Sequence, residues 1–291
     1  MNASVSLIIP TLNAESEIGS LIESLENQSV PPDEIIVIDS SSDDQTTKIA
    51  SSYRDVMVET IERANFNHGL TRDFALKRSS GDIVCFMTQD AVPANNDYLK
   101  NLINPILMDQ SVAISSGRQL PKEDARRFEQ LIREYNYAPE SNIRSSDDVP
   151  FLGIKTYFAT DVCSAYRRNV YDELGGFGCT DINEDMLMAA KAVNAGWKVA
   201  YAANAEVFHS HNLTLYEQYK RNYKIGRFLE ENAAILASAS EIGEGTKLVK
   251  HVAYRLFREG NIPELLAFSA DCVARLLGNR LGRRRARRID A

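Results

Sequence analysis

Short apolar runs separated by an amphipathic helix open the chain, and this alternation restricts its fold more than any other sequence feature. The run at 5–10 reads VSLIIP, and the run at 34–38 reads EIIVI. Continuous apolar runs of this length are typical of strands buried on both faces of a parallel sheet. From Ile18 to Leu25, apolar residues recur with the spacing of one helix face. This part of the chain therefore predicts a right-handed βαβ unit.

The same alternation continues to residue 117. It predicts strands at 56–60, 83–88 and 112–117 and helices near 46–54, from Gly69 onward and at 96–108. This order favours an α/β fold with a mostly parallel central sheet flanked by helices. Such sheets bind ligands beyond the carboxyl ends of their strands, so we expect the residues after Ile9, Ile38 and Met87 to meet in one crevice.

The second half of the chain is expected to be less regular and then helical. Residues 121–153 are charged and show no periodic pattern, and we interpret them as a mobile or acceptor-side insertion. We expect helices near 168–174 and 185–195, strands at 198–202 and 206–209, and a helical chain beyond Thr214. We expect one domain at 1–215, with a first half at 1–117 and a second half at 118–215. A helical C-terminal extension is expected at 216–291.

Composition and charge exclude several classes of protein. The four cysteines are far apart and form no CxxC pair, so we expect neither a disulfide framework nor a zinc site. We expect the protein to reside in a reducing cytosol. No apolar run is long enough to span a membrane. The net charge is −7, which argues against nucleic acid as the main ligand. Residues 272–291, by contrast, hold seven arginines and one aspartate. They predict either contact with an anionic lipid surface or a solvated terminus.

Small polar residues follow the first two predicted strands. Pro10, Thr11 and Asn13 come after the first strand, and Asp39 ends the second. Such residues can hydrogen-bond a nucleobase and a ribose, with Asp39 accepting from a ring N–H. They also suit turns and helix caps, so both interpretations stay open at this point.

Phosphate would have to be held without the usual glycine-rich loops. The chain has no GxGxxG after the first strand and no GxxxxGK[ST]. Gln89 and Asp90 follow the apolar strand that ends at Met87, which places a carboxylate at a strand end. A carboxylate there could bind Mg²⁺ or Mn²⁺, and the cation could bridge to phosphate oxygens.

A second candidate anion site precedes the helix predicted from Gly69 onward. Asn67, His68 and Gly69 come before the helix, and Arg72 lies in its first turn. Backbone N–H groups and a guanidinium could both face an anion there. A glycine-containing loop followed by a surface arginine is the alternative interpretation.

Two further groups of residues, in the second half of the chain, are candidates for catalysis or metal binding. Glu184 and Asp185 begin a predicted helix, where one carboxylate could act as a general base toward an acceptor hydroxyl or merely complement the helix dipole. His209 and His211 close an apolar strand two residues apart and should point to the same side. Such a pair could ligate a metal or contact a diphosphate, although isolated pairs are more often structural.

Taken in order, these segments resemble glycosyltransferase family 2, the inverting enzymes of the GT-A fold, over about residues 4–215. SLIIPTLNAESEIGSLIESL at 6–25 is similar to the family's opening strand and helix, and EIIVIDSSSDDQT at 34–46 is similar to its nucleoside-binding segment. LGGFGCTDINEDMLMAAKAVNAGWKVAY at 174–201 resembles the segment that supplies the catalytic base. The order and spacing of the three segments make the resemblance specific.

Three shorter motifs look most like bacterial rhamnosyltransferases that use dTDP-L-rhamnose to build surface polysaccharides. They are FNHGLTRD at 66–73, FMTQDA at 86–91 and VFHSHNLT at 207–214. Thr88 stands where the family's common acidic motif has its first aspartate, whereas Asp90 keeps the last. The rhamnosyltransferase-like subgroup tends to show this TQDA form.

The resemblance implies an inverting, metal-dependent transfer of a sugar to a saccharide or a lipid-linked saccharide. It implies these roles: base recognition for Asp39, donor binding for Arg72, metal binding for Asp90, the catalytic base for Asp185, and diphosphate contact for His209 or His211. A UDP- or GDP-sugar donor and a non-catalytic nucleotide-sugar-binding subunit are the alternatives. The resemblance also implies a nucleotide-sugar-binding half at 1–117, a cytoplasmic location and peripheral contact with the inner membrane. No feature indicates an oligomeric state.

Overall fold

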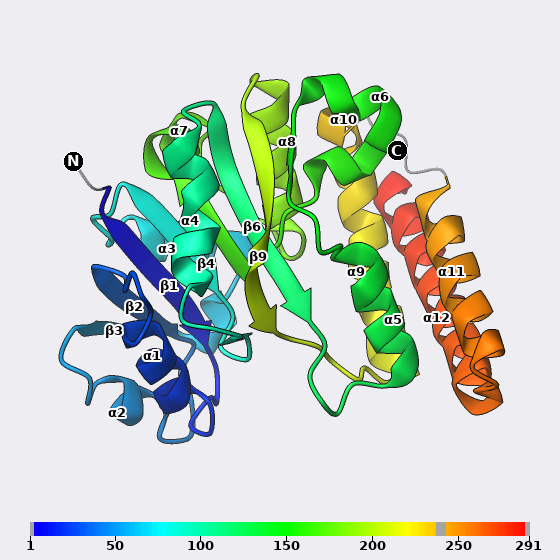
Figure 1. Cartoon of the computed structure of the whole chain (residues 1–291), viewed down its shortest axis with the longest axis horizontal. Coiled ribbons are helices and arrows are strands. Elements are labelled where there is room, and N and C mark those ends of the chain that lie inside the picture. The colour runs from blue at the N-terminus through cyan, green and yellow to red at the C-terminus, as the bar shows by residue number, and fades with distance from the viewer. Residues whose placement is uncertain (1–2, 237–242, 289–291) are drawn as a thin grey trace. The chain divides into compact units, whose positions relative to one another are not determined.

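The computed structural model describes residues 3–236 and 243–288, and the chain divides into two compact units (Figure 1). The first unit consists of Met1–Arg118, Pro139–Asp148 and Thr156–His209. The second consists of Gln119–Ala138, Val149–Lys155 and Ser210–Ala291. The predicted helical extension also includes residues 237–242 and 289–291, which lie outside the described residues.

Four parallel strands form one half of the sheet in the first unit. They are β1 (Val5–Thr11), β2 (Glu34–Asp39), β3 (Val56–Thr60) and β4 (Ile83–Met87), in the order β3-β2-β1-β4. The predicted βαβ unit is confirmed, because α1 (Ile18–Glu26) connects β1 to β2. Its apolar face is buried in the same cluster as Leu7 and Ile9. Thr11 lies opposite Asp39, so the two strands end at the same edge of the sheet.

The remaining helices of this unit follow the predicted order, with shorter bounds. They are α2 (Thr46–Ala50), α3 (His68–Leu76), α4 (Tyr98–Met108), α7 (Arg168–Glu173) and α8 (Glu184–Asn194). α4 buries Tyr98, Leu102 and Ile106 on one face, as the helical spacing of its apolar residues requires. The helices predicted at 96–108 and 185–195 are therefore confirmed to within two residues.

Beyond β4 the sheet has antiparallel pairs. β8 (Cys163–Arg167) pairs antiparallel with β4 and with β6 (Val112–Leu120), and β9 (Lys198–Phe208) pairs antiparallel with β5 (Val92–Pro93) and β7 (Asn142–Arg144). The α/β class is confirmed: β1, β2, β3 and β4 pair in parallel, whereas β8 is antiparallel to both of its neighbours. The two strands predicted at 198–202 and 206–209 are one strand, because the ladder continues through the exposed Asn204.

The prediction of an irregular insertion at 121–153 is wrong. This segment contains α5 (Arg127–Asn136) and the short α6 (Val149–Leu152). Phe128, Leu131 and Ile132 are buried on one side of α5. Charged residues occupy most of the remaining positions, so the narrow apolar face was not recognised in the sequence.

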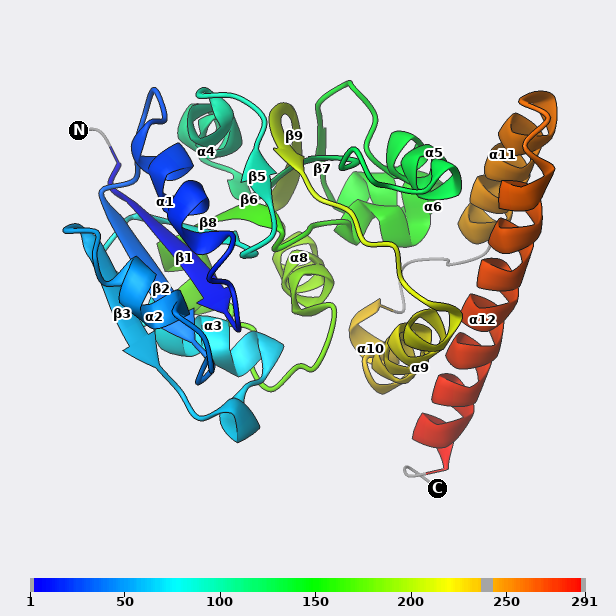
Figure 2. The ribbon, with the colours of Figure 1, turned by 90° about the horizontal axis from the view of Figure 1, so that it is seen from below.

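The helices of the second unit confirm the predicted helical extension within the described residues. They are α9 (Leu215–Glu231), α10 (Ala233–Leu236), α11 (Glu244–Arg258) and α12 (Ile262–Arg287). Figure 2 shows α12 running along α9, where a Cβ atom at Gly282 would overlap the carbonyl oxygen of Tyr223. Phe128, Val252 and Phe268 belong to the apolar cluster that joins α5, α11 and α12. Within residues 3–236 and 243–288, no helix combines the length and apolarity that a membrane crossing requires.

Candidate active site

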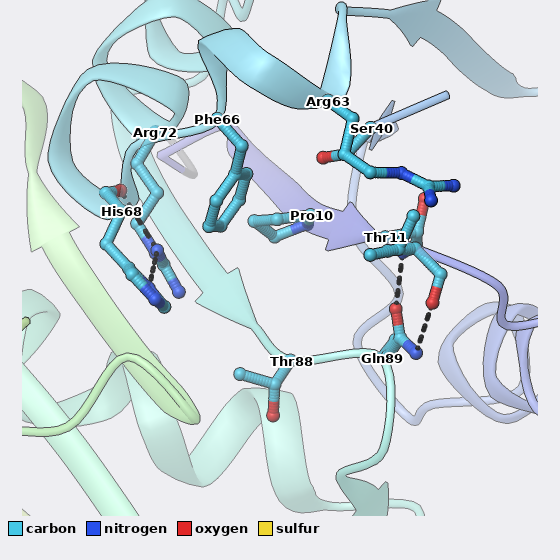
Figure 3. Close-up of a pocket in the computed structure, with 10 residues that line it drawn as sticks. Pro10, Thr11, Ser40, Arg63, Phe66, His68, Arg72, Thr88 and Gln89 are labelled. Carbon is cyan, nitrogen blue, oxygen red and sulfur yellow. Dashed lines mark hydrogen bonds between the residues drawn. The ribbon is translucent and has the colours of Figure 1, made fainter. Parts of the chain in front are cut away.

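A pocket of about 280 Å³ lies at the carboxyl ends of β1, β2 and β4 (Figure 3). Its walls are formed by Pro10, Thr11, Leu12, Ser40, Arg63, Phe66, His68, Arg72, Thr88 and Gln89. Pro10, Ser40 and Thr88 follow Ile9, Ile38 and Met87 closely in sequence, and all three line this pocket. The prediction that these strand exits converge is confirmed. The pocket belongs entirely to the first unit.

Two hydroxyl groups in the pocket wall lack protein partners. Ser40 is 2% exposed, and neither its Oγ atom nor Thr88 Oγ1 has a hydrogen-bond partner among the described residues. A buried polar group without a partner costs about 1–3 kcal/mol. Phe66 is 37% exposed and projects toward Pro10 in Figure 3, so it offers an aromatic ring to a ligand. The wall thus combines an aromatic surface with two hydroxyls that a ligand could satisfy.

Other predicted donor-binding residues are engaged in shaping the pocket. Asp39 is fully buried, and its carboxylate accepts hydrogen bonds from the Ser42 backbone N–H at 2.8 Å and from the Thr11 hydroxyl at 3.3 Å. Gln89 Oε1 accepts from the Leu12 N–H at 2.8 Å, and Gln89 Nε2 donates to the Leu12 carbonyl at 3.1 Å, as the dashed lines in Figure 3 show. These contacts hold the strand exits in place.

Asn13 has a similar shaping role at the first strand exit. Its φ angle is 50°, and its Oδ1 atom accepts a hydrogen bond from the Asp43 N–H at 2.9 Å. Its own N–H donates to the Ser42 hydroxyl at 2.8 Å. The loops after β1 and β2 are therefore joined to each other. Direct contact of Asn13 or Asp39 with a ligand stays a prediction.

A buried arginine links the pocket to a group of carboxylates. The Arg72 side chain is 4% exposed, and its Nη1 atom lies 3.0 Å from Glu184 Oε1. Its Nε atom lies 3.4 Å from Asp161 Oδ2, without hydrogen-bond geometry. Burial alone would lower the pKa of Arg72, but the carboxylates of Glu184, Asp161 and Asp185 outweigh it and raise that pKa. Arg72 is therefore a fixed positive charge.

Asp161 is a member of this group that the sequence did not reveal. It is 3% exposed, and its Oδ1 atom accepts hydrogen bonds from Ser164 at 2.6 Å and Tyr166 at 2.7 Å. Burial raises its pKa to about 6, although the positive charge of Arg72 opposes the rise. Asp161 precedes β8, the central strand that was not predicted. The alternation of Ser164 and Tyr166 after an acidic residue is the signal that could have found it.

The adjacent Glu184 and Asp185 have different environments at the start of α8. Glu184 is buried and paired with Arg72. Asp185 is half-buried, its Oδ2 atom accepts from the Asp161 N–H at 3.2 Å, and it has no ion pair among the described residues. Burial, followed by the negative charges of Glu184 and Asp161, raises the pKa of Asp185 well above that of an ordinary aspartate. Of the two carboxylates, Asp185 is the one that suits proton transfer.

Helix α3 is fixed to the loop that leads to α8. The Asn67 side chain caps α3 and also accepts from the Thr180 N–H at 3.1 Å. The Gly69 N–H donates to the Thr180 carbonyl at 3.1 Å, and a Cβ atom at Gly69 would overlap the Gly178 carbonyl oxygen. Asp73 accepts from the Gly178 N–H at 2.9 Å. Asn67 and Gly69 therefore position this loop, and a role in anion binding stays a prediction.

Asp90 and His209 form a candidate metal site. His209 Nε2 lies 3.4 Å from Asp90 Oδ2. The pairing of Val92 with Phe208 explains this proximity. Val92 lies two residues after Asp90, and Phe208 directly precedes His209. Carboxylate oxygen and imidazole nitrogen are common ligands of Mn²⁺ and related cations. His211 is exposed and lies two residues farther along the chain, in the second unit.

Comparison with known proteins shows the family of the chain. The family model described as glycosyl transferase family 2 matches residues 6–175. The O-antigen chain rhamnosyltransferase RfbN of Salmonella typhimurium is 39% identical over 284 residues, which cover 96% of this chain and 89% of RfbN. The O-antigen chain rhamnosyltransferase WbaN of Salmonella anatum is 38% identical over 286 residues, with the same two coverages of 96% and 89%.

Solved structures share the fold at low sequence identity. The mannosyltransferase PcManGT from Pyrobaculum calidifontis, solved with GDP-Man and Mn²⁺, has a TM-score of 0.64 at 18% identity and covers 97% of this chain and 85% of its own. S. aureus TarS 1–349 in complex with UDP-GlcNAc has a TM-score of 0.61 at 20% identity, with coverages of 87% and 71%. These neighbours establish the GT-A fold. Since the family model spans more than half of the chain, the protein is a glycosyltransferase that belongs to glycosyl transferase family 2.

Proposed function

We propose that the protein transfers L-rhamnose from dTDP-L-rhamnose to a hydroxyl of a saccharide or a lipid-linked saccharide in cell-surface polysaccharide synthesis. The observation that carries the proposal is that Arg72 and His68 line the strand-exit pocket and also contact Glu184, at 3.0 and 3.7 Å. A nucleotide in this pocket would therefore lie beside the carboxylates at the start of α8. The names of RfbN and WbaN support rhamnose as the sugar.

The pocket wall provides the contacts that a nucleoside diphosphate requires. Phe66 stacks on the base. Asp39, which is buried at the end of β2 and does not itself line the pocket, is the predicted acceptor for a ring N–H of the pyrimidine. The hydroxyls of Ser40 and Thr88, which lack partners among the described residues, bond to the bound nucleotide. Arg72 faces the diphosphate end, where its fixed charge stabilises the leaving group.

The proposed cofactor is Mg²⁺ or Mn²⁺. Asp90 and His209, whose Oδ2 and Nε2 atoms lie 3.4 Å apart, are proposed to hold the ion, and His211 stays a predicted ligand. When bound, the cation supplies positive charge to the diphosphate of the donor. Because Thr88 leaves Asp90 as the one carboxylate among these residues, the donor diphosphate would have to help hold the ion. Mn²⁺ in the PcManGT complex supports this assignment.

Asp185 is the proposed catalytic base. It takes the proton from the acceptor hydroxyl while that oxygen forms a bond to the anomeric carbon. The bond from this carbon to the diphosphate oxygen breaks on the opposite face, so the configuration inverts. Arg72 holds Glu184 in its buried ion pair, and the charge of Glu184 helps to raise the pKa of Asp185 toward the range of an effective base.

Calorimetric titration with dTDP, UDP and GDP in the presence of Mn²⁺ tests the donor. We expect dTDP to bind at least about tenfold more tightly than UDP or GDP, which corresponds to about 1.4 kcal/mol of discrimination. We also expect the enzyme to release dTDP from dTDP-L-rhamnose. Preference for UDP or GDP would support the alternative donors, whereas binding without any release of the nucleotide would support a non-catalytic subunit.

We also propose that α12 lies on an anionic membrane surface. Leu277 and Leu281 are 50% and 42% exposed, and the helical spacing places Arg284 on the same face. Arg280, Arg284 and Arg285 have no carboxylate partner among the described residues. By contrast, Arg275 and Arg287 pair with Asp271 and Glu230, respectively. The apolar face would enter the acyl boundary, and the arginines would meet lipid phosphates.

Liposome cosedimentation tests this contact. Replacing Arg280, Arg284 and Arg285 with glutamine should weaken binding to phosphatidylglycerol vesicles by on the order of 100-fold, because each basic residue contributes about 1 kcal/mol. Substitution is preferable to deleting residues 279–291, since Gly282 packs closely against α9. Arg227→Gln, which removes an arginine paired with Glu231, is the control. Unchanged binding of the triple variant would refute the proposal.

A further inference from the structure

A polar cavity of about 200 Å³ lies within the second unit. Of the site residues considered above, its lining includes His211, a predicted metal ligand. It is lined by α5, α9 and α12, which Figure 2 shows, together with residues that follow β9. Each of the three helices contributes one arginine: Arg133 from α5, Arg221 from α9 and Arg275 from α12. Glu129 is the single carboxylate among the residues that line the cavity. Three guanidinium groups thus face one negative charge.

Two of these arginines have carboxylate partners. Arg133 Nε lies 3.1 Å from Glu129 Oε1, and Arg275 Nε lies 2.5 Å from Asp271 Oδ2. Asp271 is itself buried and accepts a hydrogen bond from Gln218. Arg221 differs, because it has no ion pair among residues 3–236 and 243–288. Its charge is therefore the excess charge of the cavity.

The surroundings of Arg221 oppose its charge. Arg221 is exposed, but protein atoms near its guanidinium group lower its pKa through desolvation. The positive charges of Arg133 and Arg275 lower it further, and Tyr137 and Glu129 offset the effect in part. Positive charges that are held close together destabilise one another unless an anion compensates them. The protein as a whole carries a net charge of −7, so this concentration of arginine is a local exception.

We propose that this cavity binds a phosphoryl group, and that the group belongs to the acceptor substrate. Guanidinium groups form paired hydrogen bonds to phosphate oxygens, and three of them from three helices can surround one tetrahedral oxyanion. A volume of about 200 Å³ accommodates a phosphoryl group with part of its substituent. The assignment to the acceptor rests on the proposed sugar transfer, because a lipid-linked saccharide carries phosphate next to its first sugar. The cavity would then select acceptors that carry this charge.

Thermal unfolding in the presence of inorganic phosphate tests the cavity directly. The measurement uses the full chain with EDTA, and sodium chloride of equal ionic strength replaces phosphate in the reference. We expect phosphate to raise the unfolding temperature of the wild type. Arg221→Gln should lose this shift, with at least about tenfold weaker phosphate binding, because one charge-assisted hydrogen-bonding group is gone. Arg221→Lys should retain part of the shift, since it keeps the charge without the planar fork.

Arg227→Gln is the matched control, because Arg227 lies on the same helix and pairs with Glu231. It should keep the full shift. Without phosphate, Arg221→Gln should unfold at the same temperature as the wild type or higher, since one of three repelling charges has been removed. Equal stabilisation by chloride, or a full shift in Arg221→Gln, would overturn the proposal.

A second arm identifies the source of the phosphoryl group. The phosphate titration is repeated on protein saturated with dTDP and Mn²⁺. If the shift persists, the cavity is separate from the site of the donor diphosphate, as the acceptor assignment requires. If dTDP abolishes the shift, the cavity serves the donor, and the acceptor assignment is wrong. Because neither arm depends on turnover, a wrong catalytic base would leave this result unchanged. If the calorimetric titration shows that UDP or GDP binds in place of dTDP, that nucleotide is used in the second arm.

Discussion

Asp185→Asn is expected to reduce sugar transfer by about 100- to 10,000-fold, the range that loss of a general base produces. Asparagine has almost the same shape as aspartate, but it cannot accept the proton of the acceptor hydroxyl. The Asp161 N–H can still donate to its side-chain oxygen, so the start of α8 should keep its structure. Donor affinity, measured by calorimetry with dTDP and Mn²⁺, should stay within about twofold of the wild type, since the proposed diphosphate contacts are elsewhere.

Asp90→Asn is the informative comparison. The change removes the carboxylate that is proposed to bind the metal, so donor binding should weaken. Higher concentrations of Mn²⁺ should restore part of the donor affinity. The two variants thus separate chemistry from binding. Near-normal turnover of Asp185→Asn would show that another group accepts the proton.

The wild-type enzyme should also show an acidic limit to its rate. The proposed base acts in its deprotonated form, and burial together with Glu184 and Asp161 raises the pKa of Asp185. Transfer should therefore fall as the pH decreases through this raised pKa, above the range of ordinary carboxyl groups. Measuring kcat against pH at saturating donor should show this limit.

Arg72→Gln is expected to lower the free energy of unfolding by about 3–5 kcal/mol at neutral pH, because it leaves buried carboxylates without their cation. Arg72 lies 3.0 Å from Glu184 and 3.4 Å from Asp161, and all three side chains are at most 6% exposed. Glutamine offers hydrogen bonds without charge. Urea unfolding of the protein without ligand measures the loss independently of donor binding.

The pH dependence of this loss provides a second readout. Without Arg72, the folded-state pKa of Asp161 should rise further above its unfolded value. A raised carboxyl pKa destabilises the folded state increasingly as the pH rises above the unfolded value of about 4. The loss in free energy of unfolding caused by Arg72→Gln should therefore be smaller at pH 5 than at pH 8.

Arg78→Gln is the control for this prediction. Arg78 forms an ion pair with Glu59 at 2.6 Å, but the two side chains are 36% and 32% exposed. Surface pairs of this kind contribute about 0–1 kcal/mol. A similar loss of stability in both variants would show that the buried pairing of Arg72 with Glu184 and Asp161 contributes no more than a surface ion pair.

The first half of the sheet could be predicted because local sequence decides it. β1, β2 and β4 are buried on both faces, so each appears as an apolar run, and α1 shows a full apolar face. β8 could not be predicted in this way. Its sequence CSAYR alternates polar and apolar residues, and it is central in the sheet through its antiparallel pairing with β4 and β6. That pairing joins segments about 80 residues apart in sequence.

In the candidate site, too, local sequence indicated some features, whereas others depend on tertiary contacts. Residue type and position at strand ends indicated Asp39, Gln89 and Asp90, because parallel strands end at one edge. Their partners depend on tertiary contacts, so the bonds from Gln89 to the Leu12 backbone could not be foreseen. Asp161 went unnoticed for the same reason, since its proximity to Arg72 requires β8 to lie beside β4.

The attachment of α3 to the loop before α8 has a consequence for changing the donor sugar. Gly69, Asn67 and Asp73 each contact this loop, so directed evolution at α3 would displace the segment that carries Asp185. Gains in donor acceptance there should come with losses in turnover. Arg63 and Phe66 line the same pocket, lie outside α3 and, in the part of the chain that the structure describes, have no hydrogen bond to that loop. A library that varies these two positions offers new donor preferences with an intact reaction centre.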